Sequence, residues 1–529
     1  MTKTGPWSDI NKVLPNSLSK ETIESLEALN FPTMTPVQEN VIPLLLNYKD
    51  VAVEAITGSG KTLAFLVPAI EFLKKYSSQK NELTVLILVP TRELAKQVLD
   101  VLTPFIQFHP FIKPQLLIGG CTADEDYEKY KEIVPNIIIA TPGKLHDFIT
   151  LLPSNEFKRL ELFIVDEADQ ILKNGLENHL TAIFQALPKQ RRTGLFSATL
   201  TSELLKITHA GMRNPVFLRI KNEGATPVEL VNFYTIVDPV YKLVQLILFL
   251  KNDVSNQKAI VFVLTGAIAD YFTDVLRLFF GENDENKENY RPILPLYGQM
   301  EQPDRDKSLS TFKDKENAIL VATDIAARGI DIPDVEWIIQ FDAPQDPKMF
   351  IHRVGRTARI GNTGNAILFL REAEDAYVDY MTNQKVDMRE TEIEFDKDTA
   401  EEMLKKIRTH AMQTREFYEK GMRAMPSYAR AYGEHKLKLL LIKKKVNFVD
   451  LGNSFGLVRL PAMPELKNDL EKVSEYNEKY AEFNEPYKND KIDVKKKQQP
   501  QKKKHLTADE ENALYQLRHR KGGFRPHKK

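Results

Sequence analysis

Two short segments of the chain carry the residue types that bind phosphate and magnesium. Residues 55–62 (AITGSGKT) are rich in glycine and follow an apolar run, so backbone N–H groups and Lys61 can bind phosphate oxygens while the Thr62 hydroxyl binds Mg²⁺. Residues 166–169 (DEAD) follow the apolar run 162–165. A buried strand that ends in adjacent carboxylates can hold a hydrated Mg²⁺. The pair predicts a magnesium and phosphate site.

The elements that must position these segments form a repeated pattern. Short β-branched runs alternate with amphipathic stretches, which is typical of parallel sheets covered by crossover helices. The carboxyl ends of such strands meet at one edge of the sheet, where ligands bind. We therefore expect one site at that edge. The runs lie at residues 51–53, 85–89, 137–139, 162–165 and 193–196, and again at 259–263, 319–322, 335–339 and 366–370.

The second half of the pattern has no glycine-rich phosphate loop. It does have several arginines after a strand, at residues 353–359. This combination suggests that the second domain completes the nucleotide site of the first, in the cleft between them. The boundary should lie near residues 220–226, where the apolar pattern breaks.

Two further segments place the chain in a known family by resemblance. Residues 197–199 (SAT) follow a strand, and residues 352–359 read HRVGRTAR. With the first two segments, in this order, they make the chain resemble the DEAD-box RNA helicases. The resemblance covers most of residues 7–466 and implies an α/β fold: two tandem RecA-like domains with parallel sheets, a helical C-terminal extension and a basic tail.

The resemblance also implies roles in ATP hydrolysis. Asp166 would hold Mg²⁺ through water, and Glu167 would polarise the attacking water as a general base. Arg356 and Arg359 match the arginine fingers, whose guanidinium groups stabilise the transferred phosphoryl group. The catalytic set is Lys61, Asp166, Glu167, Arg356 and Arg359, and the metal set is Thr62 and Asp166. The ATP-binding set is Phe31, Gln38, Ala55, Ile56, Thr57, Gly58, Ser59, Gly60, Lys61, Thr62 and Asp331.

Phe31 and residues 35–38 match the family's Q motif. The aromatic ring would stack on adenine, and the Gln38 amide offers both the donor and the acceptor that the adenine edge requires. ATP is therefore preferred over GTP. Trp7 is the candidate for a further upstream aromatic, but its spacing favours packing under the domain.

RNA contacts and coupling residues follow from the same resemblance. Hydroxyls, arginines and N–H groups at helix starts suit phosphates and 2′-OH groups. Lys144 stands where an arginine is usual, and Cys121 is expected to be a small packed residue. The RNA set is Arg92, Gly119, Gly120, Thr141, Pro142, Gly143, Thr323, Arg328 and Gly329. A further set would couple the state of the bound ATP to strand separation. This coupling set is Ser197, Thr199, Asp169 and His352.

Residues 387–470 resemble the C-terminal extension of one DEAD-box subfamily, which acts on large-subunit ribosomal RNA. Pre-rRNA, the pre-ribosomal particle and its assembly factors are the implied partners, in the nucleus and nucleolus. The expected domains are residues 1–222 with the Q motif, 223–386, the helical extension 387–470 and a charged, largely disordered tail 471–529.

Composition agrees with a folded, soluble chain. Of 529 residues, 42% are hydrophobic and 28% charged, and no apolar stretch reaches the roughly 18 residues of a membrane helix. The single cysteine excludes an intramolecular disulfide, so we expect a reducing compartment, and no structural metal is implied. The net charge is zero, yet residues 491–529 hold 13 Lys and Arg against 4 Asp and Glu. That tail should be attracted to nucleic-acid phosphates.

Two alternatives stay open at this point. An ATP-gated scaffold could bind pre-ribosomal RNA without unwinding it, although the intact Lys61, Glu167 and Arg356 argue against that function. A DNA helicase of the same superfamily is disfavoured by the Q motif and by the ribosomal type of extension.

Overall fold

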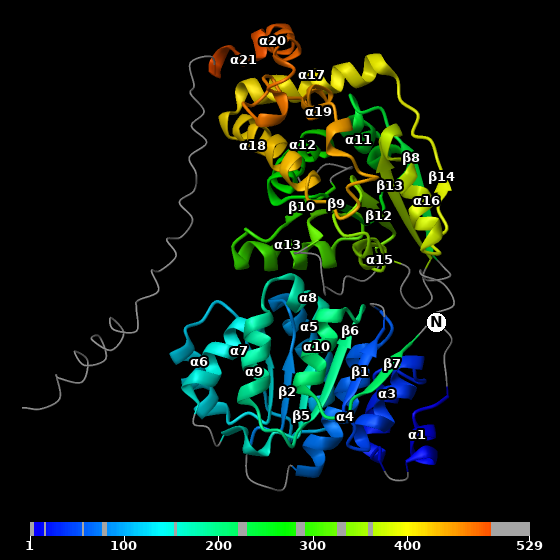
Figure 1. Ribbon diagram of the computed structural model, residues 1–529, viewed down its shortest axis with the longest axis vertical. Helices are drawn as coiled ribbons and strands as arrows, with labels where there is room; N and C mark the ends of the chain where they lie inside the picture. The colour runs from blue at the N-terminus through cyan, green and yellow to red at the C-terminus, as the bar shows by residue number, and fades with distance from the viewer. Residues whose placement is uncertain are drawn as a thin grey trace, which may run out of the picture. The chain divides into compact units, whose positions relative to one another are not determined.

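The structure, a computed structural model, describes residues 5–14, 17–55, 58–76, 82–152, 156–220, 230–281, 291–324, 335–357 and 363–487. It contains two seven-stranded sheets in which every strand pair is parallel, followed by a set of helices (Figure 1). Both sheets belong to one compact unit that ends at Phe483. The expected α/β fold with two tandem RecA-like sheets is confirmed. No helix in the described part of the chain is long and apolar enough to span a bilayer.

The first sheet has the strand order β3-β4-β2-β5-β6-β1-β7. Its central strands are continuous apolar runs such as VLIL and IIIA, buried on both faces, as expected for a parallel sheet between helical layers. The strands are β1 (Val51–Glu54), β2 (Val85–Leu88), β3 (Pro114–Leu117), β4 (Ile137–Ala140), β5 (Leu162–Val165), β6 (Arg192–Ser197) and β7 (Val216–Arg219).

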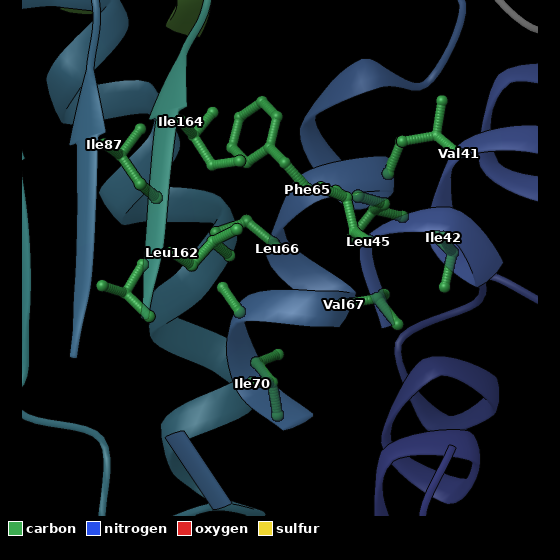
Figure 2. Packing of buried hydrophobic residues seen from close by; sticks show 14 of the residues in the cluster. Val41, Ile42, Leu45, Phe65, Leu66, Val67, Ile70, Ile87, Leu162 and Ile164 are labelled. Atoms are coloured by element: carbon green, nitrogen blue, oxygen red, sulfur yellow. The ribbon is translucent and has the colours of Figure 1, made fainter. Parts of the chain in front are cut away.

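Helices cover both faces of this sheet, and several of them begin within a few residues of the end of a strand. Figure 2 shows α4 packed between the sheet and α3, with Phe65 and Leu66 near Leu162 and Ile164. Burial of each such side chain stabilises the fold by about 1.5–3 kcal/mol. The helices are α1 (Ser8–Val13), α2 (Lys20–Ala28), α3 (Pro36–Leu46), α4 (Lys61–Tyr76), α5 (Arg92–Ile106), α6 (Ala123–Ile133), α7 (Pro142–Leu151), η1 (Glu156–Arg159), α8 (Ala168–Lys173), α9 (Glu177–Ala186) and α10 (Ser202–Gly211).

The second sheet repeats the plan with the order β10-β11-β9-β12-β13-β8-β14. Its strands are β8 (Leu230–Ile236), β9 (Ala259–Phe262), β10 (Ile293–Leu296), β11 (Ile319–Ala322), β12 (Trp337–Gln340), β13 (Gly364–Leu370) and β14 (Arg389–Glu390). Its helices are α11 (Lys242–Asn252), α12 (Gly266–Phe280), α13 (Gln302–Asp314), α15 (Lys348–Val354), η2 (Glu372–Glu374) and α16 (Ala376–Asn383).

The helical extension packs on the second sheet's helices. Gly421 of α18 lies against the Tyr271 ring of α12, where an added Cβ would come within 3.2 Å of the ring. The Tyr428 hydroxyl of α18 donates to the Asp342 carboxylate (2.8 Å). The elements are α17 (Lys397–Gln413), α18 (Arg415–Tyr432), η3 (Lys443–Lys445), α19 (Phe448–Ser454), η4 (Pro464–Leu466), α20 (Leu470–Lys479), α21 (Ala481–Asn484) and η5 (Glu485–Tyr487).

The extension continues past residue 470, where the sequence placed the start of a disordered tail. Tyr476 and Tyr480 of this segment are buried. Their hydroxyls donate to the Leu457 carbonyl (2.6 Å) and the Asn453 side chain (2.9 Å). The boundary at residue 470 is therefore too early. The sequence of α20 is mostly charged, so its apolar face was overlooked. Two aromatic rings four residues apart form that face.

One buried hydrogen bond tests the docking of the extension. The Tyr271 hydroxyl donates to the Phe455 carbonyl (2.6 Å), and both residues are buried. Tyr271→Phe leaves that carbonyl without its donor, at a cost of about 1–3 kcal/mol. We call each sheet with its covering helices a lobe. We expect the thermal midpoint of unfolding of the second lobe to fall by a few degrees in calorimetry. Tyr127→Phe is the control, because Lys131 contacts the face of its ring rather than its hydroxyl; equal midpoints for the two variants would contradict this account.

Candidate active site

The carboxyl ends of β1, β5 and β6 bring three of the sequence segments together. The N–H of Ala55, which opens the glycine-rich loop, donates to the Ser197 carbonyl (2.9 Å). The N–H of Asp166 donates to the Leu88 carbonyl (2.9 Å), so the first carboxylate starts where the strand ends. Because β6 lies between β1 and β5, the loop, the carboxylates and the hydroxyl segment share one edge of the sheet.

Lys61 and Glu167 form a buried ion pair at this edge. The Lys61 ammonium donates to Glu167 Oε1 (3.0 Å) and to the Ala55 carbonyl (3.2 Å). Burial alone would lower the pKa of Lys61, but the Glu167 and Asp166 charges raise it. Burial would likewise raise the pKa of Glu167, yet Lys61, His352 and Arg356 hold it low. Both groups are therefore charged, and a triphosphate that recruits Lys61 must release Glu167.

Asp166 supplies the hard oxygen donor that a magnesium ion requires. Its side chain is buried and accepts from the Glu167 N–H (2.8 Å). Burial raises the pKa of Asp166, and the Glu167 and Asp169 carboxylates add to this shift, although Lys61 opposes it. A divalent cation would supply the missing charge, and the Thr62 hydroxyl at the start of α4 is a second oxygen ligand of the right type. The residues present thus fit Mg²⁺.

Gln38 ties the Q motif to the glycine-rich loop. Its Oε1 accepts from the Thr35 N–H (2.8 Å) and its Nε2 donates to the Gly60 carbonyl (3.1 Å). Gly60 has φ of +90°, and an added Cβ would come within 2.7 Å of Gln38 Nε2. Phe31 is 37% exposed and so is free to stack on a base, whereas Trp7 is buried and donates from Nε1 to the Phe31 carbonyl (2.5 Å). Trp7 therefore packs under the domain, as the sequence indicated.

Gln38→Glu tests this amide directly. The carboxylate keeps the acceptor for the Thr35 N–H but replaces the donor to the Gly60 carbonyl with a repelling oxygen. At about 1–3 kcal/mol for a buried unpaired group, the KM for ATP should rise about 10- to 100-fold. Gln97→Glu, a substitution of the same type on α5, should leave the KM for ATP unchanged. A steady-state ATPase titration checks both, and an unaltered KM in Gln38→Glu would contradict the assignment.

The second lobe brings His352 and Arg356 towards the carboxylates of the first. Burial lowers the pKa of His352 to about 4 although Glu167 and Asp169 act to raise it, so the imidazole is neutral. Burial also lowers the pKa of Arg356, and Glu167 opposes that shift. The Arg356 Nε donates to the His352 carbonyl (3.2 Å), which fixes the guanidinium at the end of α15. A cation from the second lobe thus faces the site of the first.

The neighbouring Arg353 has a structural role that sequence reasoning missed. Its guanidinium pairs with both Asp324 oxygens (2.6 and 3.0 Å) and donates to Gln340 and the Asp342 carbonyl. The side chain is 1% exposed. Arg353 therefore holds α15 on its sheet, whereas nothing in the sequence distinguishes it from the neighbouring Arg356, which is also buried.

Ser197 and Asp169 connect the hydroxyl segment to the acidic segment. The Ser197 hydroxyl donates to Asp169 Oδ1 (2.7 Å) and its oxygen accepts from the Thr199 N–H (3.3 Å). The Lys173 ammonium donates to Asp169 Oδ2 (3.2 Å). The structure thus brings the predicted coupling residues Ser197, Thr199 and Asp169 together.

Arg92, a predicted RNA contact, pairs across the two lobes. Its guanidinium donates to Gln302 Oε1 (3.3 Å) of α13, and Glu93 accepts from Gln302 (3.2 Å) and from Arg305 (3.0 Å). A Cβ on Gly119 would come within 2.2 Å of Arg92, so that glycine makes room for the guanidinium. Gln302 and Arg305 were not predicted. Gln302 and Arg305 are three residues apart and so lie on one face of α13, and both carry hydrogen-bond donors. This spacing is the sequence signal that could have identified them.

The remaining described RNA residues lie at strand ends. Thr141 and Pro142 start α7, and Gly143 is in its first turn. Thr323 follows β11 and is buried, with its N–H donating to the Leu296 carbonyl (3.1 Å). Gly120 has φ of +126°.

The expectation that Cys121 is packed is wrong. The side chain is exposed, next to the Gly120 turn. Its carbonyl accepts from Lys144 (2.7 Å), which also pairs with Asp126. Both the backbone and the thiol of Cys121 thus have a lysine partner, since the Lys129 ammonium donates to Cys121 Sγ (3.8 Å). Several predicted site residues lie outside the described residues, namely Ile56, Thr57, Arg328, Gly329, Asp331 and Arg359, together with the tail from residue 488.

Three family models match the chain in order along the sequence. They are "DEAD/DEAH box helicase" at residues 35–207, "Helicase conserved C-terminal domain" at 239–361 and "ATP-dependent rRNA helicase SPB4-like, C-terminal extension" at 414–463. The chain is 41% identical over 478 residues to "ATP-dependent RNA helicase DDX55" of Gallus gallus, covering 88% of this chain and 78% of the relative. It is also 41% identical over 472 residues to "DEAD-box ATP-dependent RNA helicase 18" of Oryza sativa subsp. japonica (86% and 71% covered).

Solved structures agree with the fold. The chain is similar to "DEAD-box helicase Mss116 bound to ssRNA and UDP-BeF", with a TM-score of 0.75, 25% identity and coverage of 90% of this chain and 97% of the other. It is similar in fold to "S. cerevisiae Dbp5 bound to RNA and ADP BeF3", with a TM-score of 0.62, 24% identity and coverage of 76% and 100%.

Proposed function

Since this chain belongs to the DEAD-box RNA helicases, as an ATP-dependent enzyme of the type with an SPB4-like extension, we propose that it remodels ribosomal RNA during assembly of the large ribosomal subunit. The substrate is then a short duplex or an RNA–protein contact within pre-rRNA, on a pre-ribosomal particle with its assembly factors. The location that follows is the nucleolus. The observation that supports the RNA class most directly is the extension at residues 414–463.

The described residues suggest how ATP is bound. Gln38 and Phe31 bind the adenine. Lys61 breaks its ion pair with Glu167 and binds the phosphates instead. Asp166 and Thr62 would hold Mg²⁺, which when bound screens the phosphate charge. Glu167, released from Lys61, then accepts the proton of the attacking water.

The second lobe completes the site. Arg356 extends towards the phosphoryl group from the end of α15, where its cation lies within electrostatic range of Glu167. Loss of the γ-phosphate removes the attraction for Lys61 and Arg356 together. Lys61 can then return to Glu167, and the lobes separate. RNA bound by both lobes favours the closed state, which links strand bending to ATP turnover.

One assay tests the substrate class. ATPase rates are measured with a single-stranded RNA and with the DNA of the same sequence, and strand separation is followed on a short RNA duplex. We expect stimulation by RNA well above that by DNA, and separation that needs ATP. Crosslinking of the protein to RNA in cells, followed by sequencing, should recover large-subunit pre-rRNA. Equal stimulation by DNA, or turnover indifferent to RNA, would contradict the proposal.

A further inference from the structure

A row of charged side chains joins the active-site edge to the C-terminal extension. Asp169 accepts from Lys173 (3.2 Å), whose ammonium lies 3.7 Å from Asp346 Oδ2 of the second lobe. The same Asp346 oxygen accepts from Lys436 of the extension (2.9 Å). We call Asp169, Lys173, Asp346 and Lys436 the charge bridge. It spans the first lobe, the second lobe and the extension.

The inner members of the charge bridge are shielded from water. The side chains of Asp169, Asp346 and Lys173 are 1%, 13% and 23% exposed. Burial would raise the pKa of Asp346, but Lys436 and Lys173 lower it, so the carboxylate stays ionised between two cations. The Lys173–Asp346 pair is therefore screened less than a pair in open solvent, whereas Lys436, the outer member, is 66% exposed and its pair with Asp346 is screened more.

The extension holds the same loop through its backbone. The Lys436 N–H donates to the Gln345 carbonyl (2.8 Å), and Gln345 Nε2 donates to the Ala431 carbonyl at the end of α18 (2.7 Å). Asp346 in turn accepts from the Lys348 N–H (3.1 Å), which starts α15. α15 carries His352 and ends just before Arg356. The extension therefore contacts the loop that leads into the helix that presents the arginine finger.

A cavity of about 600 Å³ lies beside the charge bridge. It is lined by residues from all three parts, among them Thr199, His352, Tyr380 and Leu437. Apolar packing does not fill this junction. Charged contacts cross between the two lobes, namely those of Lys173 with Asp346, Lys96 with Asp306 and Arg305 with Glu93.

We propose that Asp346 and Lys436 are positioning residues for ATP hydrolysis: through the charge bridge the extension holds the start of α15 against the first lobe and so favours lobe closure on ATP and RNA. The inference rests on the proposed RNA-coupled ATPase. The extension is then part of the catalytic cycle as well as a means of reaching the RNA.

The test uses the full-length protein and an RNA titration of the ATPase rate. Lys436→Met should raise the RNA concentration for half-maximal rate about 3- to 10-fold, with kcat at saturating RNA and ATP nearly unchanged, because saturation restores closure. Lys436→Arg should restore the wild-type value. In an Asp346→Asn background, Lys436→Met should add no further change, because its partner is already neutral. Lys438→Met, an exposed lysine of the same segment, is the matched control.

Other outcomes overturn the inference. If Lys436→Met has the same effect in both backgrounds, or if Lys438→Met matches it, Lys436 acts on RNA phosphates and the charge bridge has no role. An unchanged titration in Lys436→Met with normal thermal stability would have the same consequence. A wild-type protein whose ATPase ignores RNA would instead overturn the proposed function, and the inference with it.

Discussion

Glu167→Gln should lower the RNA-stimulated ATPase rate by about 10²- to 10⁴-fold while ATP binding persists. An amide of the same size cannot accept a proton from water. The substitution also removes the carboxylate that holds Lys61 at 3.0 Å, so Lys61 is free for phosphate and ATP affinity should hold or rise. Single-turnover hydrolysis and binding of a fluorescent ATP analogue measure the two effects separately.

Glu161→Gln is the matched control for Glu167→Gln. Glu161 directly precedes β5, at the end of the strand opposite to Glu167. Its N–H donates to the Thr84 carbonyl (2.9 Å). The control should retain full ATPase activity. A Glu167→Gln protein that hydrolyses ATP at the wild-type rate, or that no longer binds ATP, would contradict the assigned role.

Arg356→Ala should lower kcat by about 10³-fold or more, with a small change in ATP affinity. In the proposed mechanism the guanidinium stabilises charge that develops only as the phosphoryl group transfers, so its loss should affect the transition state more than the bound substrate. Arg356→Lys should remain strongly impaired, since an ammonium lacks the planar pair of donors. Quenched-flow measurement of the hydrolysis step distinguishes slow chemistry from slow product release.

The adjacent Arg353 provides the contrast. Because it is paired with Asp324 and buried, Arg353→Met should destabilise the second lobe by about 3–5 kcal/mol. Its defect should therefore appear in thermal unfolding, whereas Arg356→Ala should melt near the wild-type temperature. The reverse pattern would mean that the two arginines have exchanged roles.

The central strands of both sheets could be predicted from the sequence because burial on two faces leaves continuous apolar runs. The missed strands are those to which that reason does not apply. β3, β7, β10 and β14 lie at sheet edges, where one side needs no partner. β8 was missed as well, although it lies between β13 and β14, because its residues alternate between buried and partly exposed positions instead of forming a continuous apolar run. β3 and β10 contain prolines, which edge strands tolerate, and β7 alternates between half-buried and exposed residues.

The candidate site could be predicted as far as its residues are local in sequence. The glycine-rich loop, the acidic segment and the hydroxyl segment each follow a strand, so strand order alone brings them to one edge. The contacts of Arg305 with Glu93 and of Lys173 with Asp346 join residues more than 150 positions apart. No periodicity encodes such pairs, since they depend on how one lobe faces the other.

The most direct test of a triphosphate shared by both lobes is a structure of the full-length protein with a non-hydrolysable ATP analogue, Mg²⁺ and single-stranded RNA. We expect Lys61 to have left Glu167 for the phosphates, and the Arg356 guanidinium to lie within hydrogen-bond distance of the γ-phosphate. An Arg356 side chain turned away from the nucleotide, with Lys61 still paired to Glu167, would contradict the account.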